Sequence, residues 1–169
     1  FNRWLFQQAA QILHQLRMDG LEIDVSINLS ATDLYDAEVP DLIGQALSTW
    51  NLEAARLCLE ITETSMLDES SGSNVSEVLY RLRQLGVALS IDDFGTGFSG
   101  MSRLKRLAVQ EVKIDRSFVI DLLASARDRE IAASIIDLSH RLGIEVTAEG
   151  VEDGNTAELL AGMGCDYIQ

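Results

Sequence analysis

Basic residues are scarce in this sequence. Its 13 Lys and Arg stand against 27 Asp and Glu, which gives a formal net charge of −14 at pH 7. Proteins bind long nucleic acids mainly through Lys and Arg side chains that contact phosphates, so this balance argues against such a partner. It does not exclude a small anion that is bound through metal ions, because bound cations can invert the local field.

Cysteine, histidine and long apolar runs are scarce as well. Cys58 and Cys165 are too few for a disulfide framework, and we expect both to be reduced core residues of a cytoplasmic protein. His14 and His140 fall in helical patterns and are interpreted as helix residues rather than metal ligands. No apolar run has the length of a membrane span, and the beginning lacks a signal-peptide pattern. Because the first residues already read as a helix, we expect a longer parent protein, which other regions could anchor to a membrane.

Helical and strand patterns alternate along the chain, whose 169 residues are enough for one domain with a sizeable core. Amphipathic periodicity predicts helices over about 2–19, 39–49, 75–85, 101–107, 118–123, 127–142 and 156–163. Period-two alternation predicts strands over 23–29, 57–62, 87–92, 111–114, 144–148 and from residue 165 onward. No internal repeat or Pro-rich linker interrupts them. The pattern therefore indicates a single α/β domain over residues 1–169 with a mostly parallel sheet.

In each predicted strand, every second residue is mostly Val, Ile or Leu, and the residues between them are small or polar. This favours a barrel, in which the apolar residues face an outer ring of helices and the others face the axis. An antiparallel sheet with one polar face would also alternate, but the intervening helices disfavour it. A closed (β/α)8 barrel has eight strands. We therefore predict a TIM-like barrel of which about six strands are present, and we expect the domain to be incomplete at both ends.

Polar residues stand at or near the carboxyl ends of the predicted strands, where (β/α)8 barrels carry their active sites. They are Asn28, Glu60, Asp92, Lys113, Glu149 and Gln169, with Asp93 adjacent to Asp92. Apart from the lysine they offer only oxygen donors, which selects Mg²⁺ or Mn²⁺ over Zn²⁺. Their four carboxylates can neutralise two divalent ions, and two metals suit in-line displacement at phosphorus. Lys113 could orient a water or stabilise phosphoryl oxygens, or form a structural salt bridge instead.

Asp92 and Asp93 are followed by three glycines, at positions 95, 97 and 100, so the backbone there must turn freely or approach another group closely. A pair of carboxylates at a strand end before such a loop is a credible metal ligand set. The alternative is a plain surface Asp-Asp turn.

Six ordered segments resemble the EAL family of cyclic di-GMP phosphodiesterases, and together they cover the whole chain. They are Ser26-Ile-Asn-Leu-Ser30, Leu59-Glu-Ile-Thr-Glu63, Ile91-Asp-Asp-Phe-Gly-Thr-Gly97, Val112-Lys-Ile-Asp-Arg-Ser-Phe118, Ala148-Glu-Gly-Val-Glu152 and Gly164-Cys-Asp-Tyr-Ile-Gln169. The resemblance implies a (β/α)8 barrel of the EAL type with one reversed strand. It also implies hydrolysis of cyclic di-GMP to the linear dinucleotide with two Mg²⁺ or Mn²⁺ ions.

The resemblance also implies roles for single residues. Asn28, Glu60, Asp92 and Glu149 match metal ligands, and Asp93 matches a carboxylate shared near both metals. Glu152 and Gln169 match residues that hold a water or the second metal, and Lys113 matches the lysine that positions the attacking water. Glu63 matches a glutamate that tethers the glycine loop. Homodimers and attached sensory or diguanylate cyclase domains are further partners that the family implies.

This sequence departs from the family pattern in several places. The first-strand Glu-Ala-Leu segment and its nearby arginine are absent, and the chain stops at Gln169. Phe98, Gly100 and Ala108 stand where the family usually has Tyr, Ser and Pro. We therefore keep three hypotheses: an active phosphodiesterase, a module that binds cyclic di-GMP without cutting it, and a regulatory or dimerisation barrel without a ligand.

Overall fold

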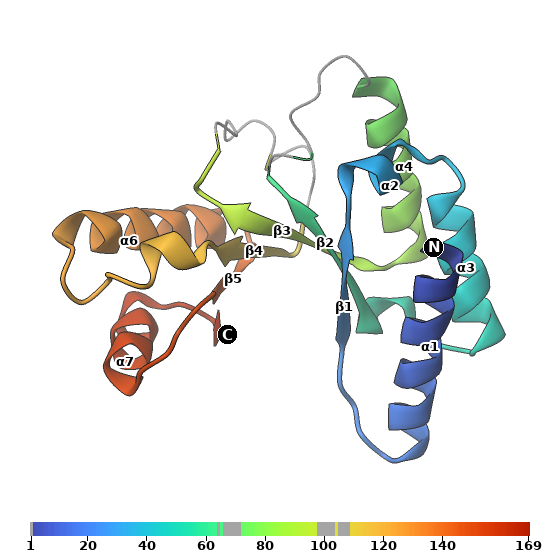
Figure 1. Cartoon of the computed structure of the whole chain (residues 1–169), viewed down its shortest axis with the longest axis horizontal. Coiled ribbons are helices and arrows are strands. Elements are labelled where there is room, and N and C mark those ends of the chain that lie inside the picture. Colours follow the sequence, from blue (N-terminus) through green and yellow to red (C-terminus); the bar gives the residue numbers. More distant parts are fainter. Residues whose placement is uncertain (1, 64, 66–71, 98–103, 105–108) are drawn as a thin grey trace. The chain divides into compact units, whose positions relative to one another are not determined.

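A computed structural model describes residues 2–63, 65, 72–97, 104 and 109–169 of the 169-residue chain (Figure 1). The chain forms two compact units. The first unit comprises residues 1–61 and 65–89, and the second comprises residues 62–64 and 90–169. The predicted helix over 101–107 and the atypical Phe98, Gly100 and Ala108 lie outside the described residues, apart from Leu104 within that helix.

The first unit places helices against a pair of parallel strands. Its elements are α1 (Asn2–Met18), β1 (Val25–Leu29), α2 (Ala31–Tyr35), α3 (Val39–Thr49), η1 (Ala54–Arg56), β2 (Leu57–Thr62, of which Thr62 belongs to the second unit) and α4 (Gly72–Leu85). Helix α1 packs against α3, and both α2 and α3 pack against α4 (Figure 1). Strands β1 and β2 are parallel, with Asn28 opposite Glu60. Buried apolar side chains such as Leu34, Ile43 and Leu82 fill the space between these elements.

Helix α2 was not predicted, because its five residues are too short for a visible periodicity. A capping box starts it: the Ser30 hydroxyl accepts from the Asp33 N–H, and the Asp33 carboxylate accepts from the Ser30 N–H. These bonds satisfy backbone groups that the first turn leaves open. Four glycines that each stand between a helix and the next strand, Gly20, Gly86, Gly143 and Gly164, have φ values of 79°, 84°, 72° and 89°. Glycine carries no Cβ penalty in this left-handed region, so it ends these helices.

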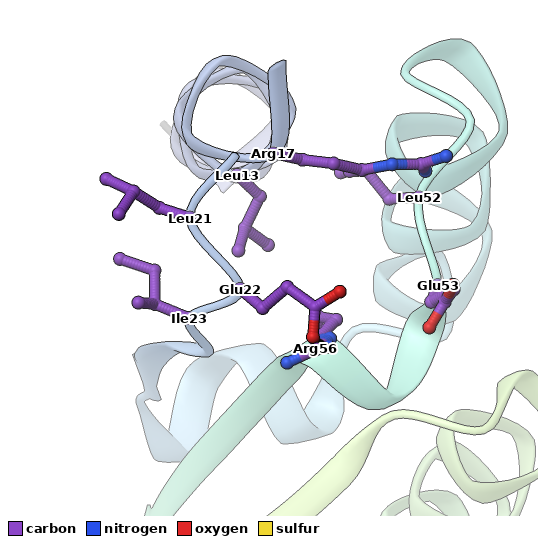
Figure 2. A pocket seen from close by; sticks show the side chains of 8 residues that line it. All are labelled: Leu13, Arg17, Leu21, Glu22, Ile23, Leu52, Glu53 and Arg56. Carbon is purple, nitrogen blue, oxygen red and sulfur yellow. Dashed lines mark hydrogen bonds and ion pairs between the residues drawn. The ribbon is translucent and has the colours of Figure 1, made fainter. Parts of the chain in front are cut away.

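A small pocket in the first unit lies between α1, the segment after it and η1 (Figure 2). Leu13, Leu21, Ile23 and Leu52 give it apolar walls, whereas Arg17, Glu22, Glu53 and Arg56 carry its charges. The Arg56 guanidinium forms ion pairs with Glu22 at 3.2 Å and with Asp24 at 3.1 Å. None of the residues predicted to be functional lines this pocket.

The second unit is a parallel α/β array. It contains β3 (Ala88–Phe94, from residue 90 onward), β4 (Glu111–Ile114), η4 (Arg116–Phe118), α6 (Ala126–Arg141), β5 (Glu145–Ala148), α7 (Gly154–Met163) and β6 (Tyr167–Ile168). Strands β3, β4, β5 and β6 pair in chain order, each parallel to the next. Helix α6 packs against β4, β5 and η4 (Figure 1). The core includes Val112, Ile114, Ile136, Val146 and Leu160.

Several predictions are confirmed and some are wrong. All six strands are present, and the α/β class and parallel pairing are confirmed, although the first strand begins at Val25 and the last at Tyr167. The reversed strand that the resemblance implies is not among the pairings within the two units. The predicted helix over 118–123 is wrong, because the chain there forms η4 and then turns. Asp115 caps η4, and the Arg129 guanidinium binds the carbonyls of Leu122 and Leu123, so these groups do not form a helical ladder.

Both cysteines are free and only half-buried, so the expectation of core residues is too strong. Among the described residues, no helix combines the length and apolar character that a membrane crossing requires.

Candidate metal centre

Three carboxylates of the second unit converge at the carboxyl ends of its strands. Asp92 and Asp93 lie near the end of β3, and Glu149 follows β5 directly. One oxygen from each lies within 4.8 Å of the others. Hard divalent cations prefer such oxygen ligands, so the donor set fits a hard divalent cation.

A local irregularity of β3 explains how two adjacent carboxylates can serve one centre. In a regular strand, consecutive side chains point to opposite faces. The pairing of β3 with β4 shifts between Ile91 and Phe94, and Asp93 has a φ of 55°. Such a bulge inserts one extra residue into the strand relative to its neighbour and bends the strand. It brings Asp93 to the side on which Asp92 already lies.

The two aspartates of the centre resist ionisation. Burial raises the pKa of Asp92, and the nearby Glu149 raises it further, whereas Lys113 opposes the shift. Burial also raises the pKa of Asp93, followed by the contributions of Asp115 and Glu149. A bound cation favours the ionised forms, so metal binding relieves this repulsion and competes with protons.

Lys113 supplies a buried positive charge inside the acidic cluster. It lies on β4, is 6% exposed, and its Nζ is 2.8 Å from Glu149 Oε1. The salt bridge that the sequence left open as an alternative is therefore formed. The same ammonium group lies beside the carboxylates. Its role toward a phosphoryl oxygen or a water stays a prediction.

Glu63 connects the end of β2 to the first two glycines after β3. Its side chain is 2% exposed, and Oε2 accepts hydrogen bonds from the N–H groups of Gly95 at 3.0 Å and Gly97 at 3.1 Å. Its own N–H donates to the Asp92 carbonyl at 3.1 Å. A Cβ on Gly97 would lie 2.8 Å from Glu63 Oε1, so this approach requires a glycine. Through these contacts Glu63 holds the backbone of Gly95 and Gly97, as a residue that tethers this segment must.

Replacement of Glu63 with Ala is expected to destabilise the protein by about 2 kcal/mol, because it leaves two backbone N–H groups without their acceptor. Glu63→Gln keeps one side-chain oxygen and should lose less. Urea unfolding of the three proteins measures the difference. Equal stability of the Ala and Gln variants would contradict the tethering role.

Glu152 lies three residues after Glu149 but does not belong to the carboxylate cluster. Glu152 is exposed and forms a 2.7 Å ion pair with Arg116. The Arg116 stem runs over Gly150, whose φ is 72°, and a Cβ there would collide with it. Gln169 is held by its backbone, which bonds to Ala148 and Val151.

Asn28 and Glu60 belong to the first unit, where they are opposite each other on β1 and β2. Glu60 is buried and Asn28 is exposed. Both stand near the carboxyl ends of parallel strands, as predicted.

Two residues of the second unit were not selected from the sequence. Asp115 follows β4, interacts with Asp93 and accepts from the Ser117 N–H at 3.0 Å. It lies two residues after Lys113 and therefore on the same alternating set of positions, which is the pattern that could have identified it. Arg116 carries no such signal, because its partner Glu152 is 36 residues away.

Parallel strands with helices between them, and carboxylates at the strand ends, are typical of α/β barrel proteins, whose active sites lie at that end of the strands. The family model "EAL domain" matches residues 1–169. The chain belongs to the EAL domain family, and its fold is the TIM-like barrel type of that family.

The chain is similar to several known members of the family. It is 39% identical to the cyclic di-GMP phosphodiesterase NbdA of Pseudomonas aeruginosa over 98% of this chain and 21% of NbdA. It is 37% identical to MucR of the same organism, a bifunctional diguanylate cyclase/cyclic di-GMP phosphodiesterase, over 98% of this chain and 24% of MucR. The chain thus spans less than a quarter of these curated relatives.

Solved structures show the same fold. The MucR phosphodiesterase in its c-di-GMP complex matches with a TM-score of 0.89 and 34% identity, over 99% of this chain and 72% of that structure. The EAL domain of DcpA from Mycobacterium smegmatis also has a TM-score of 0.89 and 34% identity, over 98% of this chain and 74% of that domain.

Proposed function

We propose that this chain carries the metal centre of a phosphodiesterase that hydrolyses cyclic di-GMP to linear pGpG with two Mg²⁺ or Mn²⁺ ions. The observation that carries the proposal is the convergence of Asp92, Asp93 and Glu149 within 4.8 Å in a member of the EAL family. The name of NbdA and the ligand of the MucR structure support the choice of substrate.

The proposed ligands are the oxygen donors at the strand ends. Bound Mg²⁺ or Mn²⁺ would stabilise charge on phosphoryl oxygens and lower the pKa of a water nucleophile. We assign the binding of metal to Asn28, Glu60, Asp92, Asp93, Glu149 and Gln169. Lys113 would position the attacking water or a phosphoryl oxygen, Glu152 would hold a water, and Glu63 would keep the glycine loop in place.

The organisation of the whole protein is part of the proposal. We infer that residues 1–169 act as one domain, which is supported by a family match over both units. Attached sensory or diguanylate cyclase domains are supported by the bifunctional relative MucR, of which this chain covers 24%. A homodimer formed through this domain completes the proposal.

The test is product formation from cyclic di-GMP by the full-length protein, followed by chromatography. We expect linear pGpG with Mg²⁺ or Mn²⁺ and none after chelation with EDTA. Saturable binding without product would assign the protein to the non-catalytic binding modules and overturn the proposal. Absence of both binding and product would leave a regulatory barrel instead.

A further inference from the structure

Asp166 joins the last helix to β6 and makes an unusual set of contacts. Its Oδ2 accepts hydrogen bonds from the Val146 N–H at 2.8 Å and lies 2.8 Å from His140 Nε2. Its own N–H donates to the Val146 carbonyl at 3.1 Å. Asp166 therefore satisfies both backbone groups of one residue in β5, while His140 of α6 contacts the same carboxylate oxygen.

These contacts determine where β6 lies against β5. Beyond Asp166, the register pairs Thr147 with Tyr167 and Ala148 with Ile168. The Gln169 N–H then donates to the Ala148 carbonyl at 2.9 Å, and its carbonyl accepts from the Val151 N–H at 3.0 Å. The backbone of Gln169 is thus bonded on both sides of Glu149 and Gly150. Strand β6 braces the segment that presents Glu149 to the carboxylate cluster.

We propose that the His140–Asp166 pair is a positioning device for the candidate metal centre. His140 fixes the Asp166 carboxylate, Asp166 fixes β6 against β5, and β6 holds the backbone around Glu149. The inference rests on the proposed function only in requiring that the carboxylate cluster binds a divalent cation.

The pair differs from an ordinary surface ion pair. In α6, Arg141 and Asp137 also form a 2.8 Å pair, but their side chains are 74% and 65% exposed and lie within a single helix. The His140 and Asp166 side chains are 41% and 33% exposed and connect a helix to a strand start. Burial opposes ionisation of Asp166, but hydrogen bonds from His140 and the Val146 N–H outweigh it and lower its pKa.

The experiment compares His140→Leu, His140→Gln and Asp137→Asn in the full chain, with Mn²⁺ alone as the probe. Free Mn²⁺ is measured by electron paramagnetic resonance, and hydrogen exchange by mass spectrometry on peptides that cover residues 145–169. Leucine removes the hydrogen-bond donor, glutamine restores one, and Asp137→Asn is the matched control that removes the neighbouring ion pair.

We expect His140→Leu to weaken Mn²⁺ binding by about three- to tenfold, somewhat less than the 10- to 100-fold typical of a direct hydrogen-bond partner of a ligand. Exchange at residues 146–151 should accelerate with it. His140→Gln should recover most of both losses, and Asp137→Asn should change neither.

Unchanged Mn²⁺ affinity in a folded His140→Leu protein would overturn the inference, as would an equal loss in the glutamine variant. If His140→Leu fails to fold, Asp166→Asn provides the same comparison, because it keeps an oxygen acceptor but loses the charge. These results do not depend on hydrolysis. Mn²⁺ binding without turnover would contradict the proposed function alone, whereas a wild-type chain that binds no Mn²⁺ would contradict both.

Discussion

Replacement of Asp92 with Asn is expected to abolish hydrolysis of cyclic di-GMP and at the same time to stabilise the metal-free protein. Loss of a proposed direct ligand should reduce the turnover by more than about 100-fold, beyond the range for residues that only support a ligand. The gain in stability follows from the raised pKa of Asp92, because burial and Glu149 make its ionised form unfavourable. A neutral amide of the same shape removes that cost.

The stability that Asp92→Asn gains should depend on pH in one direction. A carboxyl group whose pKa is raised in the folded state costs stability at neutral pH, and this cost disappears as the pH falls through the raised pKa. The variant should therefore melt at a higher temperature than the wild type at pH 7 in EDTA. The difference should shrink in acid.

Calorimetry at pH 7 and pH 4 measures this effect, and Mn²⁺ titration measures the loss of binding. Asp41→Asn is a suitable control, because Asp41 forms an exposed ion pair with Arg81 and its loss should not raise the stability. An Asp92→Asn protein that is less stable than the wild type in EDTA would contradict the electrostatic account. One that retains full hydrolysis would contradict the assignment of Asp92.

The strands and the residues at their ends could be predicted because both signals are local. Alternation in β2 and β5 identifies the strands, and a polar residue marks the carboxyl end of each, Glu60 within β2 and Glu149 directly after β5. The bulge in β3 could not be predicted, since it depends on the pairing with β4. Strict alternation would have placed Asp92 and Asp93 on opposite faces, and only the shift in register brings both to one centre.

Contacts between distant residues were also beyond the reach of the sequence patterns. The pairs Lys113–Glu149 and Arg116–Glu152 are each separated by 36 residues along the chain. They form because β4 and β5 are adjacent and parallel. The failed helix over 118–123 involves a more local contact, because Arg129, at the start of the following helix, binds the carbonyls of Leu122 and Leu123.

Replacement of Lys113 with Met should destabilise the metal-free protein by about 3 kcal/mol at pH 7. Removal of one partner of a buried ion pair leaves an uncompensated charge, which typically costs about 3–5 kcal/mol. Here the charges left are those of Glu149, Asp92 and Asp93, and Lys113 opposes the rise in pKa of both aspartates. Methionine keeps most of the volume and removes the charge, so the loss reports electrostatics rather than a cavity.

Two conditions should restore the stability of the Lys113→Met protein if this account is right. The pKa values of Asp92 and Asp93 rise further in the variant, so its folded state takes up protons more readily, and the deficit should shrink as the pH falls from 7 to 5. Mn²⁺ should also restore stability, because it replaces the missing positive charge. Arg116→Met is the matched control: its ion pair with Glu152 is exposed, and such pairs contribute about 0–1 kcal/mol. Equal losses in the two variants, or a deficit that neither acid nor Mn²⁺ reduces, would show that Lys113 acts through packing instead of charge.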